Sequence, residues 1–116
     1  MEKPPVYEIE DDDNTDYEHL IGETIISVQT EEKYKKILKD ILENTLIIYE
    51  NEIIPQDATP EARERMMRTA KIIITQPGSD FVKNAYTRLK SSPHVSPPIL
   101  ANTLAKILRD RIRNRR

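Results

Sequence analysis

The residues best suited to chemistry in this chain lie on one predicted helix. Phe81, Asn84 and Arg88 recur at i, i+3 and i+7, off the apolar positions, which places them along one exposed helix line. A ring can stack on an unpaired base, an amide can read a base edge, and a guanidinium can bind a phosphate. Ser79 and Lys83 at the start of this helix add free amides and an ammonium for a phosphate. Packing of Phe81, the chain's single phenylalanine, against a neighbouring helix is the alternative.

Two other predicted helices carry clustered cations. Lys106, Arg109 and Arg113 form one stripe near the C-terminus, which could follow a phosphate backbone or simply complement the dipole of its own helix. A second cluster spreads over too wide an arc to contact one ligand, and it consists of Arg63, Arg65, Arg68 and Lys71. His94 lies in a loop, where it either contacts a ligand or is an ordinary loop histidine. These residues complete the candidate binding set.

The sequence also argues against several classes of site. Cysteine is absent, so disulfides, thiolate metal sites and a thiol nucleophile are excluded. Gly22 and Gly78 are the two glycines, too few for a P-loop or a dinucleotide-binding loop. The acidic run at 10–13 could hold a divalent cation loosely, but a solvated acidic tail is the better interpretation. No catalytic constellation is evident, so we expect no catalytic residue, no metal site, no tightly bound cofactor and no enzymatic activity of the chain by itself.

Charge is sorted along the chain although its formal total is only −2. Residues 1–29 carry nine acids and one lysine, a net charge of −8. Residues 30–59 carry seven acids and four lysines, a net of −3. Residues 60–116 carry thirteen bases and four acids, a net of +9. This segregation favours a polyanionic partner, with the acidic arm kept off the binding surface.

The elements that would position these residues are helices. We expect a disordered acidic arm over 1–15 and a helical bundle domain over 16–116. A short helix within 16–28, with Asp16 as its cap, is favoured over a strand. A long helix over 31–52, with Thr30 as N-cap, is expected to be the structural spine. The remaining helices are predicted to begin after a capping residue, and they run from Thr59-Pro60 to 75, from Ser79 to 90, and from Ser96-Pro97 to the C-terminus. The predicted fold class is all-α, a small bundle of four to five helices.

The tyrosines divide between these two parts. Tyr34, Tyr49 and Tyr86 fall on apolar helix faces and are expected in the core, with their hydroxyls at its rim. Tyr7 and Tyr17 are assigned to the acidic arm.

The order of these parts resembles a known family. An acidic, Pro-bearing linker precedes a Glu/Lys/Ile-rich helix. The segments at 59–63, 76–81 and 91–98 follow this helix in order, and an Arg-rich helix comes last. This pattern is similar to the helix-bundle domain that follows the catalytic core in primase-polymerase replication proteins of archaeal plasmids. The resemblance covers the chain from about residue 16, but no single motif is diagnostic.

The resemblance implies a function and partners. It implies binding of single-stranded DNA template and of nucleotide, ATP or another NTP with Mg²⁺ carried by the nucleotide, to assist primer initiation. The catalytic primase-polymerase domain would then precede this one on the same parent chain. Without a membrane span or signal peptide in the sequence, we expect a cytoplasmic monomer. A protein-interaction adaptor of a mobile element and a helix-turn-helix regulator of duplex DNA are the alternatives.

Overall fold

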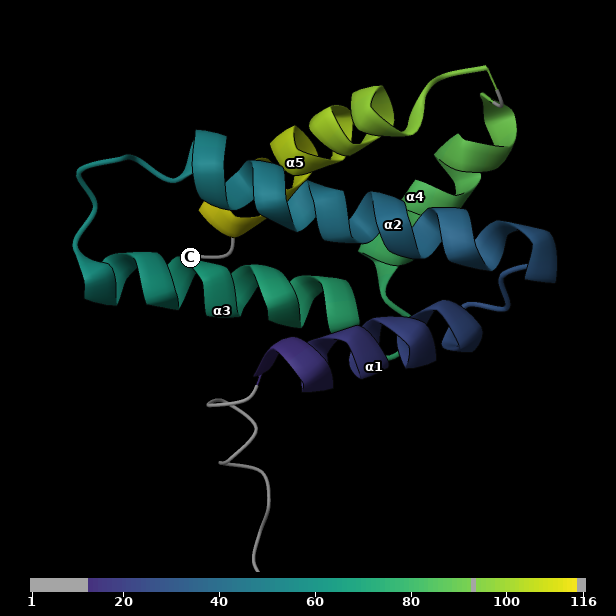
Figure 1. Ribbon diagram of the computed structural model, residues 1–116, viewed down its shortest axis with the longest axis horizontal. Helices are drawn as coiled ribbons and strands as arrows, with labels where there is room; N and C mark the ends of the chain where they lie inside the picture. Colours follow the sequence, from purple (N-terminus) through teal and green to yellow (C-terminus); the bar gives the residue numbers. More distant parts are fainter. Residues whose placement is uncertain (1–12, 93, 115–116) are drawn as a thin grey trace, which may run out of the picture.

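The helix α2 (Glu32–Ile48) runs through the middle of the molecule and contacts all four other α-helices (Figure 1). The structure is a computed structural model that describes residues 13–92 and 94–114. In the view of Figure 1, α1 and α3 lie below α2, and α5 lies above it. The bounds of the other helices are α1 Asp13–Ser27, α3 Pro60–Thr75, α4 Asp80–Ser91 and α5 Pro97–Arg113. The described residues contain no strand, which confirms the predicted all-α class.

The apolar periodicity of α2 explains its central place. Leu38, Ile41 and Leu42 are fully buried in one hydrophobic core to which every helix contributes. Burial of each such side chain stabilises the fold by about 1.5–3 kcal/mol. Thr45 is also buried in this stripe, and its hydroxyl donates to the carbonyl of Ile41 at 2.7 Å, which satisfies the polar group locally.

The first helix corrects two predictions. Residues 13–15, assigned to the arm, form the first turn of α1, whereas residues 1–12 lie outside the described residues. Tyr17, also assigned to the arm, is buried in the core with 7% of its surface exposed. It continues the buried row of Ile21 and Ile25 at i, i+4 and i+8, positions that share one helix face. The predicted helix over 16–28 therefore begins three residues earlier and includes a core aromatic.

The caps of four helices agree only in part with the sequence. Thr59 and Ser79 are N-caps as predicted. Each hydroxyl accepts a hydrogen bond from the amide three residues later, that of Ala62 or Val82. Ser96 holds the cap position of α5 but makes no side-chain cap bond. Thr30 does not cap α2: Glu31 holds the N-cap position, and the Thr30 side chain is buried directly after Gln29, whose backbone is left-handed. Instead the hydroxyl of Tyr86 accepts a hydrogen bond from the Glu31 amide at 3.0 Å.

The tyrosines assigned to the core lie there. Tyr49 and Tyr86 are buried, and Tyr34 is half-buried with its ring edge-on to that of Tyr86 at 5.7 Å between centroids. This pair joins α4 to the start of α2, where the hydroxyl of Tyr86 reaches the rim as expected.

The last turn of the predicted 31–52 helix is π-helical. This turn, η2 (Tyr49–Ile53), follows α2 directly, and the Ile54 amide donates to the carbonyl of Tyr49, five residues earlier, at 3.0 Å. The guanidinium of Arg63 donates to the carbonyls of Glu50 and Pro55, at 3.2 and 3.0 Å. Arg63 thus supplies hydrogen bonds to carbonyls that the widened turn and the following loop present.

The turn between α3 and α4 is held from α1. Gly78 has a φ of 64°, a left-handed conformation that favours glycine. Its amide donates to the hydroxyl of Ser27 at 3.1 Å, and the hydroxyl of Thr24 lies 3.1 Å from the carbonyl of Thr75. The end of α1 therefore fixes the position of this turn and of the helix start that follows it.

Candidate nucleic-acid interface

The predicted line on α4 is not a single exposed surface. Phe81 is fully buried, so the expectation that its ring is exposed for stacking on a base is wrong. The physical reason is helical geometry: Phe81, Ala85 and Leu89 are spaced at i, i+4 and i+8 and share the buried face. Phe81 occupies the core, which was the alternative drawn from the sequence.

The other two members of that line do meet. Nε of Arg88 donates to Oδ1 of Asn84 at 2.7 Å, on the outer part of α4. This contact fixes both side chains, and the guanidinium of Arg88 remains exposed. The pair keeps an amide and a cation side by side, but without an aromatic platform beside them.

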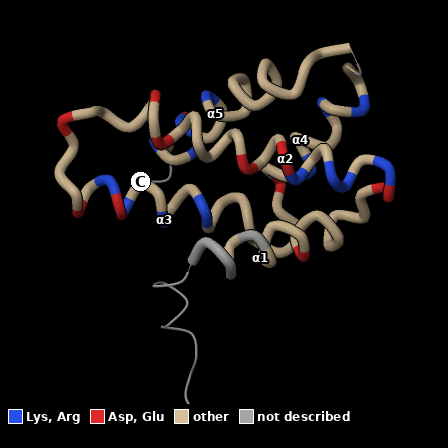
Figure 2. Tube along the Cα trace, viewed as in Figure 1, with Lys and Arg blue, Asp and Glu red and all other residues tan. Residues whose placement is uncertain are grey.

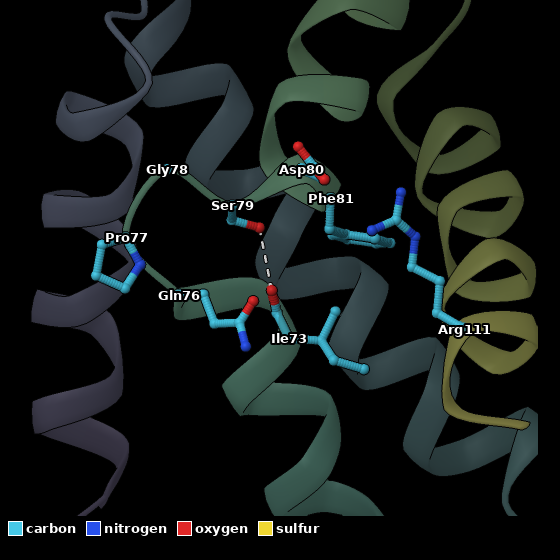
Figure 3. A pocket seen from close by; sticks show the side chains of 8 residues that line it. All are labelled: Ile73, Gln76, Pro77, Gly78, Ser79, Asp80, Phe81 and Arg111. Carbon is cyan, nitrogen blue, oxygen red and sulfur yellow. Dashed lines mark hydrogen bonds between the residues drawn. The ribbon is translucent and has the colours of Figure 1, made fainter. Parts of the chain in front are cut away.

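The start of α4 borders a cavity of about 290 Å³ (Figure 3). Ser79 is buried, and its hydroxyl accepts from the Val82 amide at 3.2 Å while donating to the carbonyl of Ile73 at 3.0 Å. Its hydrogen-bonding capacity is therefore used in positioning the helix rather than a ligand. In Figure 3, Arg111 reaches from α5 towards this helix start, and its guanidinium carbon lies 5.7 Å from the centroid of the Phe81 ring.

The acidic side chain at this helix start weakens the case for an anion. Asp80 occupies the first turn of α4, where its carboxylate already complements the positive end of the helix dipole. Arg111, the neighbouring cation, packs over a core ring by a cation–π contact. Lys83 is exposed on the next turn and forms no hydrogen bond or ion pair with any other described residue. The amides at this helix start thus have a carboxylate on the same turn, and Lys83 is a nearby cation without a partner among the described residues.

Most cations of α3 are engaged within the chain. Arg63 binds the two carbonyls described above, and Arg68 pairs with Glu64 at 3.3 Å one turn away. Nζ of Lys71 lies 5.4 Å from the centroid of the Tyr17 ring. Arg65 is exposed, and it forms no hydrogen bond or ion pair with another described residue. The sequence expectation that these four do not form one ligand site agrees with this arrangement.

The stripe on α5 remains at the surface. Lys106 and Arg113 are exposed, and neither forms an ion pair or hydrogen bond with another described residue. Arg109 lies between them, 41% exposed, with its Nε 3.2 Å from Oδ1 of Asp110. At about 100° per residue, the stripe lies on the side of α5 opposite to Arg111, which faces α4. Figure 2 shows Lys and Arg positions in the half of α5 nearest the C-terminus.

The sequence-predicted residues therefore fall into separate groups. The stripe of Lys106, Arg109 and Arg113 is one group, the Asn84–Arg88 pair is a second, and the engaged cations of α3 are a third. His94 is exposed in the turn before α5 and forms no hydrogen bond or ion pair with another described residue. Arg111 is not among the sequence-predicted binding residues, although it lies one turn from Leu108 and two turns from Leu104, on the buried face of α5.

Two buried tyrosines have raised pKa values. Burial, and to a lesser extent the charge of Glu43, raises the pKa of the Tyr17 phenol, and burial raises the pKa of Tyr49. Within 13–92 and 94–114, no three His, Cys, Asp or Glu side chains gather in a way that could hold a metal ion. None of the helices described is both long and apolar enough to span a membrane.

Comparison of the chain with protein-family models, with curated proteins and with solved structures finds no match in any of the three. Its function therefore has to be inferred from its own residues.

Proposed function

We propose that this chain binds single-stranded nucleic acid through the cationic stripe on α5, as the accessory helical domain of a replication primase-polymerase. The observation that carries the proposal is the outward placement of Lys106 and Arg113, which have no acidic partner among the described residues. With Arg109 between them, they present cations along roughly two turns of one helix, a spacing suited to consecutive phosphates.

Charge segregation supports the same proposal. The described part of the chain from residue 60 onward carries eleven bases against four acids, a net charge of +7. A positive field of this kind attracts a polyanion and accelerates its association. The proposal includes template DNA and nucleotide as ligands, a catalytic domain on the same parent chain, a monomeric state and a cytoplasmic location.

A salt titration tests the proposal directly. Fluorescence anisotropy of a labelled 20-nucleotide single strand gives log K against log[salt], and we expect a slope of about −2 to −4. Substituting all three stripe residues (Lys106→Ala, Arg109→Ala and Arg113→Ala) should make the slope shallower by about 2, at about 0.7 per phosphate contact.

A matched variant controls for net charge. Lys33→Ala, Lys36→Ala and Lys39→Ala remove three cations from α2, and we expect a much smaller change in slope. Equal losses in the two triple variants, or a flat slope for the unmodified chain, would overturn the proposal. An unlabelled duplex competitor distinguishes a helix-turn-helix regulator, which would prefer the duplex, and Mg-ATP as competitor tests nucleotide binding.

A further inference from the structure

A cavity of about 320 Å³ lies where α1, α2 and α3 meet at the π turn. Its lining combines charged, phenolic and apolar side chains, namely Tyr17, Glu43, Ile47, Glu50, Met67 and Lys71. None of these residues belongs to the stripe on α5. An inference about this cavity is therefore independent of nucleic-acid binding.

The hydroxyl of Tyr17 is a buried polar group without a partner. Tyr17 is 7% exposed, and its hydroxyl forms no hydrogen bond with any described residue. An unpaired buried hydroxyl costs folding free energy, so such a group calls for a water or a ligand. Tyr17 and Glu43 both line the cavity, and the charge of Glu43 adds to the effect of burial in raising the pKa of Tyr17. A phenol with the ordinary tyrosine pKa of about 10 is already protonated and uncharged at neutral pH, and the raised pKa of Tyr17 leaves it so.

The cavity is negatively charged. Two carboxylates, of Glu43 and Glu50, stand against the one ammonium of Lys71. Glu43 and Lys71 both have interactions within the chain. Glu50 is half-buried, and its carboxylate forms no ion pair or hydrogen bond with any other described residue. The unmet polar groups of the cavity are thus an acceptor carboxylate and a neutral phenol.

The apolar wall determines the rest of the ligand. Ile47 is 53% exposed although it lines the cavity, and Met67 lies half-buried opposite on α3. Covering this wall with a hydrocarbon stem would remove apolar surface from water. A ligand that meets all of these groups carries a stem of several methylenes and ends in a cation.

We propose that this cavity binds an organic cation with an apolar stem, an alkylammonium or alkylguanidinium whose charge pairs with Glu50 and whose N–H donates to the phenol oxygen of Tyr17. Such a group is present on free polyamines and on the lysine or arginine side chain of a partner protein. Lysine and arginine side chains commonly lay their methylene stems on apolar surface while their charge meets a carboxylate.

Two probes with the same number of carbon atoms but opposite charge test which sign of ligand charge the cavity binds. We expect n-butylamine to shift the ¹H–¹⁵N signals of Ile47, Glu50 and Met67 in the full chain at millimolar concentration, and n-butyrate at the same concentration to leave them unchanged. Shifts with butyrate instead would mean that Lys71 selects an anion and would overturn the proposal. An absence of shifts with butylamine would overturn it too.

Substitutions locate the binding groups. Glu50→Gln should weaken butylamine binding about tenfold, within the range for a hydrogen bond to a charged group. Glu52→Gln, an exposed change of the same charge on the same π turn, should weaken it less than twofold. Equal losses in both variants would show a general charge effect and overturn the site. Tyr17→Phe should weaken binding about threefold while the chain stays folded by circular dichroism, and unchanged affinity would remove the phenol from the proposal.

The two sources of the cation are then separated by affinity. Spermidine and an N-acetyl-lysine amide are titrated in the same way into the unmodified chain. Tighter binding of spermidine indicates a free polyamine, and tighter binding of the lysine derivative indicates a partner's side chain. Failure of both to shift the cavity signals would contradict the proposal even if butylamine bound.

Discussion

Helices α3 and α5 each carry four lysine or arginine residues, yet the two sets have different surroundings. In α3, Arg63 binds backbone carbonyls of the π turn and the following loop, and Arg68 pairs with Glu64. In α5, Lys106 and Arg113 point outward without partners in the described part of the chain. Residue type and spacing therefore do not by themselves define a binding surface. Whether the chain itself supplies carbonyls or acids within reach decides which cations remain for a ligand.

The largest expected effect separates core from surface on α4. Phe81→Ala should lower the free energy of unfolding by about 3–5 kcal/mol, because a fully buried ring is lost and a cavity remains. Urea denaturation followed by circular dichroism measures this. Affinity for a single strand, measured at low temperature on folded protein, should change little. A large loss of affinity with unchanged stability would return Phe81 to the binding surface.

The second prediction tests whether Arg63 is structural. Arg63→Ala should lower the free energy of unfolding by about 1–3 kcal/mol, since two carbonyls lose a charged donor. Arg65→Ala, an exposed change of the same kind two residues away, should stay within about 0.5 kcal/mol. Thermal and urea unfolding of the two variants measure the difference. Equal stabilities would mean that the contrast between α3 and α5 does not hold at this residue.

A smaller effect is expected from tuning the stripe itself. Asp110→Asn should raise affinity for a single strand by up to about fivefold, because it removes the acid that contacts Arg109. Anisotropy at low salt is the measurement, and the gain should shrink as salt screens the charges. Glu64→Gln on α3, which releases Arg68, is the matched change. If it raised affinity as much, the cations of α3 would belong to the interface as well.

The last expected effect is confined to alkaline pH. Burial raises the pKa of Tyr17 in the folded state, so the folded chain holds this proton more tightly than the unfolded chain. The associated stability is complete below about pH 10 and is lost as pH rises above it, by at most about 1.4 kcal/mol per pH unit. Urea unfolding at pH 9 to 11 should therefore show a shallower decline for Tyr17→Phe than for the unmodified chain. Parallel declines would contradict the burial of this phenol.

Much of the fold follows from local sequence signals. Thr59-Pro60 and Ser79 mark helix starts because capping and proline geometry act within one turn. The start of α1 was misplaced because the acids around Asp13 resemble a solvated arm, although Tyr17, Ile21 and Ile25 already form a helical row. The π turn had no comparable signal, since its geometry depends on packing after α2 has formed.

The candidate site was less predictable than the fold. Phe81 satisfies two spacings, one shared with Asn84 and Arg88 and one with Ala85 and Leu89, and only packing selects the second. The inward direction of Arg111 likewise depends on where α4 crosses α5. The partners of Arg63 are backbone carbonyls of an irregular turn, which no residue type in the sequence announces.

The π turn makes the chain sensitive to length at one place and tolerant a few residues later. Deleting one residue within 49–53 would favour an ordinary α-helical turn, in which each carbonyl accepts from the amide four residues later. The carbonyl of Glu50 would then leave the reach of Arg63. A deletion in the exposed loop at 55–57 would be absorbed by backbone that is free to rearrange. Insertions and deletions in natural variants of this chain should accordingly avoid the turn and collect in the loop.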